Sequence, residues 1–490
     1  MILPNKKLGK YEKYVIIVII LAIIIRFSLI SIYTVSGDAC WHFSVSKFIV
    51  NNMQIPLSEP LGRDEPFWAP PLFHIIASLF SSILSVFGSS FGLKLISPLF
   101  GSMSLIVSYL LLKKFLNEKA LFYSILFLSF IPIFIDYSIL GYMESMLTFF
   151  VLLSIYLALN NKFFLSGIAA GLSILTKYNG LFVIPVLLFI AYKYCKNKKL
   201  LLRSALIIII IPGIIGLPWF IRNWFLLGNP IWPFLNFIFK GYEQHAYSGL
   251  DITSLFSINT YIATYLGFFG IPDGNYNALS FINLPYLHIL FSIFLLATII
   301  FITPLFFGLG KSRGSIFYML LLSYGIVFIM YIINVGPFVS RMLLPAIISL
   351  AFFYGIGMER LIAKYKIGSL FPLLIILISA GFVVTEAAKF TIASRSWEFY
   401  KDDFNWVKSN TNKDDIFIVG GQCIPYHIDR ASLFPSQLKT NNYNYIWVNQ
   451  NFMLDKRSIL NKEDLQIIES KNNELVYENQ KTSTKIYKLE

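Results

Sequence analysis

The segment SGDACWHFSVSKF (residues 36–48) places an aspartate, a tryptophan and a histidine directly after a run of about twenty apolar residues. Ionisable groups beside such a run are costly in a membrane, so they are functional candidates. Asp38 has the chemistry of a general base that takes a proton from an acceptor hydroxyl. Asp38 could instead only cap the following helix, because an aspartate there accepts a backbone N–H and offsets the helix dipole. We favour a carboxylate that also takes part in chemistry.

Carboxylates and cations recur beside later apolar runs. The predicted order of membrane spans places them on the same side of the membrane as Asp38. A lone base with several cations at a lipid boundary suits transfer of a sugar from a phosphate-linked lipid. The base takes the acceptor's proton, and the cations stabilise the phosphate that leaves. Arginine donates two parallel hydrogen bonds to a phosphate, whereas lysine supplies a compact charge. The set comprises Asp38, His42, Arg63, Asp64, Glu65, Asp136, Tyr142, Glu144, Lys177, Arg222, Asn223, Glu243, His245 and Arg341.

Several members of this set also fit simpler interpretations. His42 fits a satisfied interfacial histidine. Lys177 and Arg222 fit boundary side chains that extend to the membrane surface. Asp64 and Glu65 fit solvated loop acids. We keep all five as candidates for substrate or phosphate binding.

A divalent metal is a further hypothesis for the same set. His245 with Glu243, or His42 with Asp38, could hold such an ion. Two ligands at such spacings are weak evidence for a metal site. The sequence therefore predicts no certain cofactor and leaves the metal undecided.

The composition indicates an integral membrane protein. Hydrophobic residues make up 56% of the 490 residues and charged residues 13%, whereas soluble proteins average about 25% charged. The net charge of +14 comes from basic clusters between apolar runs, which is the positive-inside pattern, so nucleic acid is not an expected partner. The first run is too long for a signal peptide and no small-residue cleavage site ends it. The widely separated cysteines show no metal-ligand spacing and are predicted to be unpaired thiols: Cys40, Cys195 and Cys423.

Basic clusters, interpreted as cytoplasmic, set the threading through the bilayer. About eleven spans result, with the N-terminus inside and the C-terminus outside. Residues 70–88 are predicted to form an interfacial or re-entrant helix, because counting them as a span would place Lys113 and Lys114 outside. The predicted spans are 14–34, 93–112, 120–138, 145–159, 163–176, 180–192, 203–221, 286–308, 315–334, 342–358 and 367–387.

The composition changes after Glu386. An amphipathic helix and four strand-like stretches, IFIVGG, NYIWV, NELVYEN and TSTKIYKL, predict a small soluble α/β domain. The expected architecture is an all-α polytopic membrane domain over residues 1–390, with interfacial helices in the first external loop. An external α/β domain over residues 391–490 follows it.

Six motifs in the expected order carry a resemblance to a known superfamily. They are GDACWHFSVSKFI, APPLFHIIA, GYMESMLTFF, LSGIAAGLSILTKYNGLFVIP, PWFIRNWFLLGNPIWPFLN and SRMLLPAI. Over most of residues 10–390 the chain resembles the GT-C polytopic glycosyltransferases. Within them it is similar to the protein O-mannosyltransferase and lipid A aminoarabinose transferase branch.

The resemblance implies roles for individual residues. Asp38 takes the place of the catalytic carboxylate in the first loop, and Glu144 matches the second acid. Lys177 and Arg222 match the cations near the lipid phosphate, with Arg341 as a further contact. The chain departs from the family where Ala39 follows Asp38 without a second acid, and where Trp68-Ala69 replaces the Glu-Lys of aminoarabinose transferases. The tryptophan-rich signature of the oligosaccharyltransferase catalytic subunit is absent from the sequence, so transfer to asparagine is not expected.

These observations predict an inverting glycosyltransferase of a prokaryotic cell membrane. Its expected partners are a polyprenyl-phosphate-linked monosaccharide, a hydroxyl acceptor on a lipid, glycan or protein, and membrane lipids. His42, Asp64, Glu65, Tyr142, Glu243 and His245 are the candidates for substrate binding. The alternative is a transporter or flippase of lipid-linked sugars, because polar groups within apolar helices also mark substrate pathways.

Overall fold

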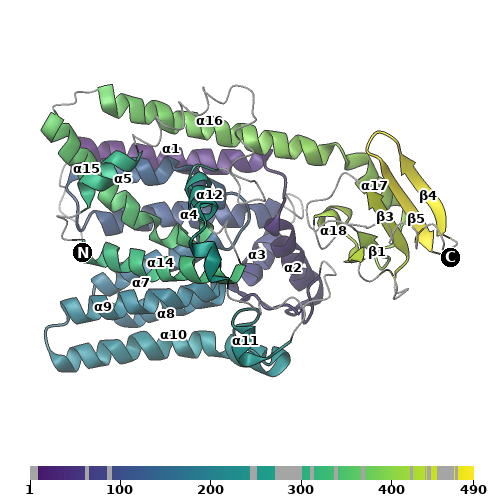
Figure 1. The fold of residues 1–490 in the computed structure, drawn as a ribbon, viewed down its shortest axis with the longest axis horizontal. Helices are drawn as coiled ribbons and strands as arrows, with labels where there is room; N and C mark the ends of the chain where they lie inside the picture. Colours follow the sequence, from purple (N-terminus) through teal and green to yellow (C-terminus); the bar gives the residue numbers. More distant parts are fainter. Residues whose placement is uncertain are drawn as a thin grey trace. The chain divides into compact units, whose positions relative to one another are not determined.

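The chain forms two compact units, each built from segments that are far apart in the sequence. The helical unit comprises Met1–Ser31, Ser97–Ile139 and Met143–Ala387, and the mixed unit comprises Ile32–Ile96, Leu140–Tyr142 and Ala388–Glu490. The computed structural model (Figure 1) describes residues 9–60, 66–84, 91–242, 251–270, 301–309, 314–335, 340–365, 370–419, 423–435, 438, 443–449, 468 and 473–489.

Long apolar helices dominate the helical unit. Within the described residues, six helical stretches are long and apolar enough to cross a membrane. A helix satisfies its own backbone hydrogen bonds, and about 20 apolar residues match the hydrocarbon core. These stretches are α1 (Lys10–Ile32), α4 (Phe91–Leu112), α10 (Lys198–Leu227), α14 (Ser315–Val335), α16 (Leu370–Glu398) and the pair η5 (Ser340–Ala346) and α15 (Ile347–Tyr365).

Shorter elements complete this unit and mostly follow the predicted spans. The predicted span 120–138 divides at Pro132, which cannot donate a backbone hydrogen bond within a helix. Of the predicted span 286–308, residues 286–300 lie outside the described residues, and residues 301–308 are helical. The count of about eleven spans stays a prediction. The shorter elements are α5 (Glu118–Phe130), α6 (Pro132–Tyr137), α7 (Glu144–Leu159), α8 (Phe163–Thr176), η2 (Tyr178–Val183), α9 (Ile184–Tyr194), α11 (Asn236–Phe239), η3 (Ile252–Leu255) and α12 (Ile258–Phe268).

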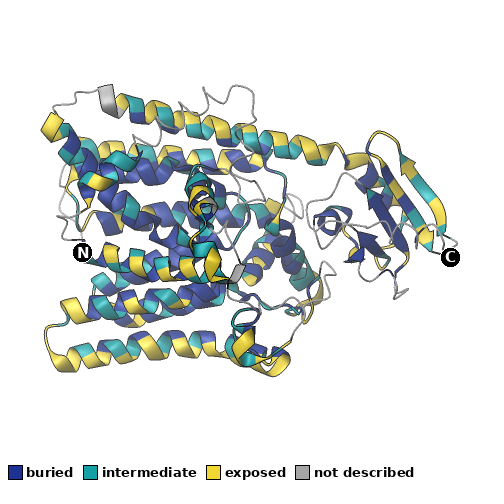
Figure 2. Ribbon diagram, viewed as in Figure 1, coloured by how far each residue is buried: buried dark blue, intermediate teal, exposed yellow. Residues whose placement is uncertain are grey.

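Burial separates inner from outer helices in the helical unit. Figure 2 shows α5, α7 and α15 as mostly buried, whereas α10 carries exposed residues along its length. Many of those exposed side chains are apolar, including Ile209, Ile214 and Phe225. Apolar side chains on an outer surface are stable against lipid rather than water. The pattern therefore fits a bundle surrounded by a bilayer.

A buried arginine connects α1 to the end of α5. Arg26 is 0% exposed and donates hydrogen bonds to the backbone oxygens of Ala22 and Ser129, each at 3.1 Å. Its guanidinium also lies 5.2 Å from the ring centroid of Phe134. The last carbonyls of a helix lack intrahelical donors, and a cation there also complements the helix dipole. Arg26 therefore caps α5 where Pro132 interrupts the chain.

The mixed unit contains a five-stranded sheet. Its order is β2 (Ala431–Leu433), β1 (Ile416–Val419), β3 (Tyr445–Asn449), β5 (Thr484–Leu489) and β4 (Asn473–Asn479). β1 pairs in parallel with β2 and β3, and β5 pairs antiparallel with β3 and β4. All four predicted strands are present, and the short edge strand β2 is additional. The domain boundary at residue 390 stays a prediction.

Side chains alternate across this sheet and build a core on each face. Phe417 and Trp447 pack with Phe404 of α17 (Lys401–Asn410), whereas Ile418 and Ile446 pack on the opposite face. Successive residues of a strand point to opposite faces, so both faces of the central strands must be covered. The sheet therefore has its own hydrophobic core.

The first loop contributes two helices to the mixed unit, α2 (Asp38–Asn52) and α3 (Leu72–Ile83). At 1.5 Å per residue, the 12 residues of α3 extend about 18 Å, which is shorter than the hydrocarbon core of about 30 Å. This length fits the predicted interfacial helix.

Candidate active site

A buried ion-pair cluster lies where three elements of the helical unit meet. Glu144 begins α7, Lys177 occupies the break between α8 and η2, and Arg341 belongs to η5. Lys177 Nζ lies 2.6 Å from Glu144 Oε1, and Arg341 Nε lies 3.7 Å from the same oxygen. Glu144 is 2% exposed and Lys177 is 8% exposed. The structure thus brings together three residues that are 33 to 197 positions apart in the sequence.

The local backbone explains how Lys177 reaches this cluster. The lysine has extended dihedrals, φ −159° and ψ 145°, so α8 stops at Thr176 and the chain restarts as the 3-10 turn η2. Gly180 packs against the Ser173 backbone so closely that a Cβ would lie 2.3 Å from a backbone carbon. The TKYNG sequence therefore forms a tight break that directs a charged side chain into the bundle.

Neighbouring polar residues extend the cluster toward Arg222. Asn179 accepts a hydrogen bond from the Tyr331 hydroxyl at 3.2 Å. Asn223 donates to the Tyr178 hydroxyl and accepts from Arg222 Nη1, both at 2.8 Å. Lys177 and Arg222 are thus joined through Tyr178 and Asn223.

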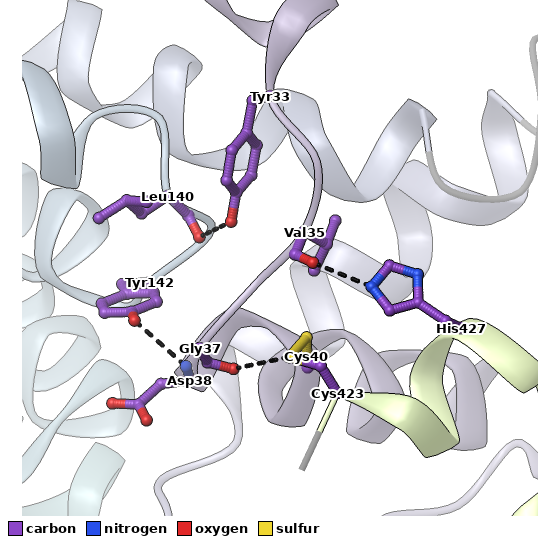
Figure 3. Close-up of a disulfide and its surroundings, with 9 residues drawn as sticks. All are labelled: Tyr33, Val35, Gly37, Asp38, Cys40, Leu140, Tyr142, Cys423 and His427. Carbon is purple, nitrogen blue, oxygen red and sulfur yellow. Dashed lines mark hydrogen bonds between the residues drawn. A yellow bond between two sulfur atoms is a disulfide. The ribbon is translucent and has the colours of Figure 1, made fainter. Parts of the chain in front are cut away.

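Asp38 lies in the mixed unit at the start of α2. The N-cap is Gly37, with φ 61° and no side-chain cap hydrogen bond, so Asp38 is the first helical residue rather than the cap. Its backbone N–H donates to the Tyr142 hydroxyl at 3.1 Å, and Figure 3 shows its carboxylate pointing away from the Cys40–Cys423 disulfide. A Cβ at position 37 would lie 2.7 Å from that hydroxyl. Glycine is therefore required here both for the positive φ and for the close approach of Tyr142.

His42, one turn after Asp38, belongs to a buried histidine pair. His42 Nδ1 lies 3.0 Å from His74 Nε2, and both rings are buried among aromatic side chains that include Trp41. Burial, with the charge of His42 as a lesser cause, holds the pKa of His74 well below its usual range. The Tyr142 ring centroid lies 6.0 Å from that of His42. The structure therefore links three predicted residues, Asp38, His42 and Tyr142, and adds His74, whose role was not predicted.

The expectation of three unpaired thiols is wrong for two of them. Cys40 and Cys423 form a disulfide with their Cα atoms 5.2 Å apart, and only Cys195 is free. The two cysteines are 383 residues apart, so no local spacing could indicate the pairing. Only the packing of the C-terminal domain against α2 brings them together. Disulfides are typical of oxidising compartments.

Three further interactions hold the C-terminal domain against the first loop within the mixed unit. The ammonium of Lys47 lies 3.1 Å from Asp429 Oδ1 and 4.3 Å from the ring centroid of Tyr426. His427 Nε2 donates to the Val35 oxygen at 3.2 Å (Figure 3). Burial lowers the pKa of His427 to about 3, so the imidazole is neutral at pH 7. We call the disulfide and these interactions the loop clamp.

Chemical counting of thiols gives a direct check on the loop clamp. Denatured but unreduced protein should titrate one free thiol, that of Cys195, and reduced protein should titrate three. Cys40→Ala should destabilise the clamped region by about 2–4 kcal/mol, because the open chain regains conformational entropy. Limited proteolysis should then cut the C-terminal domain faster. Cys195→Ala is the matched control and should change neither the stability nor the rate of proteolysis, while the thiol counts fall to none before reduction and two after it. Three free thiols in the unreduced intact protein would contradict the pairing.

Residues 68–224 match the family model described as dolichyl-phosphate-mannose-protein mannosyltransferase. Among solved structures, ArnT from Cupriavidus metallidurans bound to undecaprenyl phosphate matches with a TM-score of 0.62 at 13% identity, covering 97% of this chain and 98% of that one. The Archaeoglobus fulgidus oligosaccharyltransferase matches with a TM-score of 0.57 at 12% identity, covering 90% of this chain and 70% of that one. No curated protein matches the chain. The chain has the GT-C fold.

The family match divides the candidate residues of this GT-C chain. Glu144, Lys177 and Arg222 lie inside the matched range, whereas Asp38 and Arg341 lie outside it. The likeness to the two solved structures covers 97% and 90% of the chain. The resemblance drawn from the sequence motifs is therefore confirmed at the level of the fold.

Five residues of the predicted set are outside the part of the chain that the structure describes. Asp64, Glu65, Glu243 and His245, together with Arg63, lie outside the described residues. Among the residues that the structure does describe, no group of three or more His, Cys, Asp or Glu side chains could hold a metal ion. No metal ligands are therefore assigned.

Proposed function

We propose that the chain is an inverting glycosyltransferase that moves a monosaccharide from a polyprenyl-phosphate-linked donor to a hydroxyl of a lipid, glycan or protein. The observation that carries the proposal is the buried cluster of Glu144, Lys177 and Arg341 within a GT-C fold. Lys177 and Arg341 bring two cationic groups to one carboxylate in this cluster. Guanidinium and ammonium groups bind phosphate oxygens through charge-assisted hydrogen bonds, so the cluster suits a lipid phosphate.

The proposed donor agrees with what related folds bind. The ArnT structure contains undecaprenyl phosphate, and the AglB complex from Archaeoglobus fulgidus, with a TM-score of 0.51, contains a dolichol-phosphate. Both ligands join a long apolar chain to a phosphate. The side chain of Arg341 is 27% exposed, so its guanidinium can reach an incoming phosphate while Nε stays near Glu144. Lys177 and Arg222 are the further phosphate contacts that we propose.

In the proposed reaction, Asp38 accepts the proton of the acceptor hydroxyl as the oxygen attacks the anomeric carbon from the face opposite the phosphate. The bond from that carbon to the phosphate oxygen breaks, and its electron pair stays on the phosphate. Lys177, Arg222 and Arg341 stabilise the developing charge. A direct displacement inverts the anomeric configuration. Glu144, predicted as the second catalytic acid, holds Lys177 and Arg341 in position through its two ion pairs.

We place the reaction on the outer face, with the N-terminus cytoplasmic and the C-terminal domain external. The disulfide Cys40–Cys423 supports this orientation, because reducing cytosol disfavours such bonds. The basic residues at the start of α1 and α5, such as Lys10, Lys13 and Lys119, support a cytoplasmic location for that end of the bundle.

Cells that lack the protein provide a test that does not require the sugar to be known beforehand. The unused donor should accumulate in the deletion strain, and mass spectrometry of extracted polyprenyl-phosphate lipids should show one species enriched several-fold. Expression of the intact chain should return that species to its ordinary level, whereas expression of Asp38→Asn should not. An unchanged set of lipid-linked sugars would contradict the proposal.

A further inference from the structure

A long apolar groove lies on the helical unit, away from the ion-pair cluster. It has a volume of about 920 Å³ and is formed by α1, α5, α15 and α16. Figure 1 shows α16 running alongside α1, and both helices contribute lining residues. Apart from Lys119, Ser379 and three tyrosines, Tyr123 among them, the lining is apolar, with Ile17, Leu21, Ile25, Leu126, Phe130 and Val383 among its residues.

One end of the groove differs from the rest because polar groups gather there. Lys119, Tyr11 and Tyr14 line this end, near the first residues of α1 and α5. Within the described part of the chain, Lys119 forms no ion pair, so its charge is available to a ligand. Tyrosines at this level fit the aromatic belt of a membrane interface, with the ring in the apolar layer and the hydroxyl toward headgroups. The groove thus has a cationic mouth and an apolar body.

The length of the groove matches one leaflet. From Tyr11 to Ile25 along α1 the rise is about 21 Å. One leaflet contributes about 15 Å of the hydrocarbon core, and the headgroup layer adds several ångströms more. A ligand that fills the groove therefore has an anionic head at Lys119 and an apolar chain about one leaflet long.

We propose that this groove binds an anionic glycerophospholipid of the leaflet at which α1 begins. One acyl chain lies between α1 and α16, and the lipid phosphate contacts Lys119 and the hydroxyls of Tyr11 and Tyr14. Charge favours an anionic lipid, because Lys119 is joined at this end of the bundle by the exposed lysines Lys10 and Lys13. Of the two acids in the same helix starts, Glu12 is paired with Lys113, so the lysines still outnumber Glu118. The outer surface of α16 is largely exposed, so a bound chain supplies packing that protein side chains do not. The proposal is independent of the proposed transferase activity.

Delipidated full-length protein in detergent allows a direct test. Phosphatidylglycerol and phosphatidylcholine with identical acyl chains would be added separately, and bound lipid would be counted by native mass spectrometry. We expect at least fivefold tighter binding of phosphatidylglycerol to the intact chain, together with a higher thermal midpoint, because a ligand that binds only the folded state stabilises it. Equal binding of the two lipids would overturn the proposal.

Two variants locate the lipid on the protein. Lys119→Ala should reduce the preference for phosphatidylglycerol to less than twofold, whereas Lys162→Ala, the control at an exposed lysine outside the groove, should leave it unchanged. Ala380→Trp fills the groove from an exposed lining position and should displace both lipids. A preference that survives Lys119→Ala, or lipid counts unchanged in Ala380→Trp, would contradict the site. Stronger binding of undecaprenyl phosphate through Lys119 would contradict the choice of ligand.

Discussion

Asp38→Asn should lower turnover by about 100-fold or more, because general base catalysis contributes on that order. The amide has nearly the same shape as the carboxylate but cannot accept a proton under these conditions. The backbone N–H that donates to Tyr142 is untouched, as is the position of residue 38 as the first residue of α2. We therefore expect a folded protein with donor affinity near normal and with loss concentrated in kcat.

The effect of Asp38→Asn must be compared with the same substitution at an aspartate outside the candidate site. Asp402→Asn makes the same chemical change at an exposed position in the first turn of α17 and should leave transfer unchanged. Thermal midpoints and gel filtration profiles should be alike for the intact chain and both variants. Transfer by Asp38→Asn within a few-fold of the intact chain would remove Asp38 from its catalytic role, and Asp38 would then contribute only to the helix dipole.

Lys177→Met should reduce both stability and transfer. The substitution leaves Glu144 buried, with Arg341 Nε at 3.7 Å as its remaining ion-pair partner in the cluster. Breaking a buried pair in this way costs about 3–5 kcal/mol. Loss of a charge-assisted contact to the phosphate should lower kcat/KM by about 100- to 1000-fold. Removing one hydrogen-bond donor from an active site that excludes water has an effect of this size.

A second substitution separates the two effects of Lys177→Met. Glu144→Gln in the same chain removes the buried carboxylate that has lost its lysine partner, so the double variant should recover much of the lost thermal midpoint. Transfer should stay low, because the phosphate still lacks its lysine. A double variant that regains both stability and transfer would show that Lys177 has only a structural role.

A double-mutant cycle can also test whether Lys177 and Arg222 act on one phosphate. Tyr178 and Asn223 connect these two cations. If both cations bind one phosphate, their losses in kcat/KM should not add, because neighbouring sites that share a partner are coupled. Strictly additive and small losses would identify them as ordinary boundary residues, and the phosphate site would have to be sought around Arg341.

Local signals predicted most helices and strands of this chain. Apolar runs near 20 residues lead to helices in a bilayer, and the break at TKYNG was visible as two short apolar runs around a lysine. The strands β1, β3, β4 and β5 follow runs of β-branched and aromatic residues. The fold class could therefore be predicted because membrane thickness and backbone hydrogen bonding restrict the alternatives.

Pairings between distant segments could not be predicted in the same way. Cys40 and Cys423 are 383 residues apart, with Cys40 in α2 and Cys423 in the turn that begins the short helix α18 (Ile424–Ile428). His74 was visible only as a polar residue in an apolar helix, and its pairing with His42 depends on how α2 packs on α3. Lys177 and Glu144 were both candidates, but their contact depends on the register between α7 and the break after α8. Such contacts follow from three-dimensional packing, which periodicity does not encode.

The transfer reaction itself tests the central claim most directly. The purified chain would be placed in liposomes with a polyprenyl-phosphate sugar, chosen as the species that accumulates in the deletion strain, and with extracted acceptor. We expect free polyprenyl phosphate and glycosylated acceptor to appear in equal amounts, with the anomeric configuration inverted by NMR and both products lost in Asp38→Asn. Movement of the intact lipid-linked sugar across the bilayer without bond cleavage would contradict the account and identify a transporter.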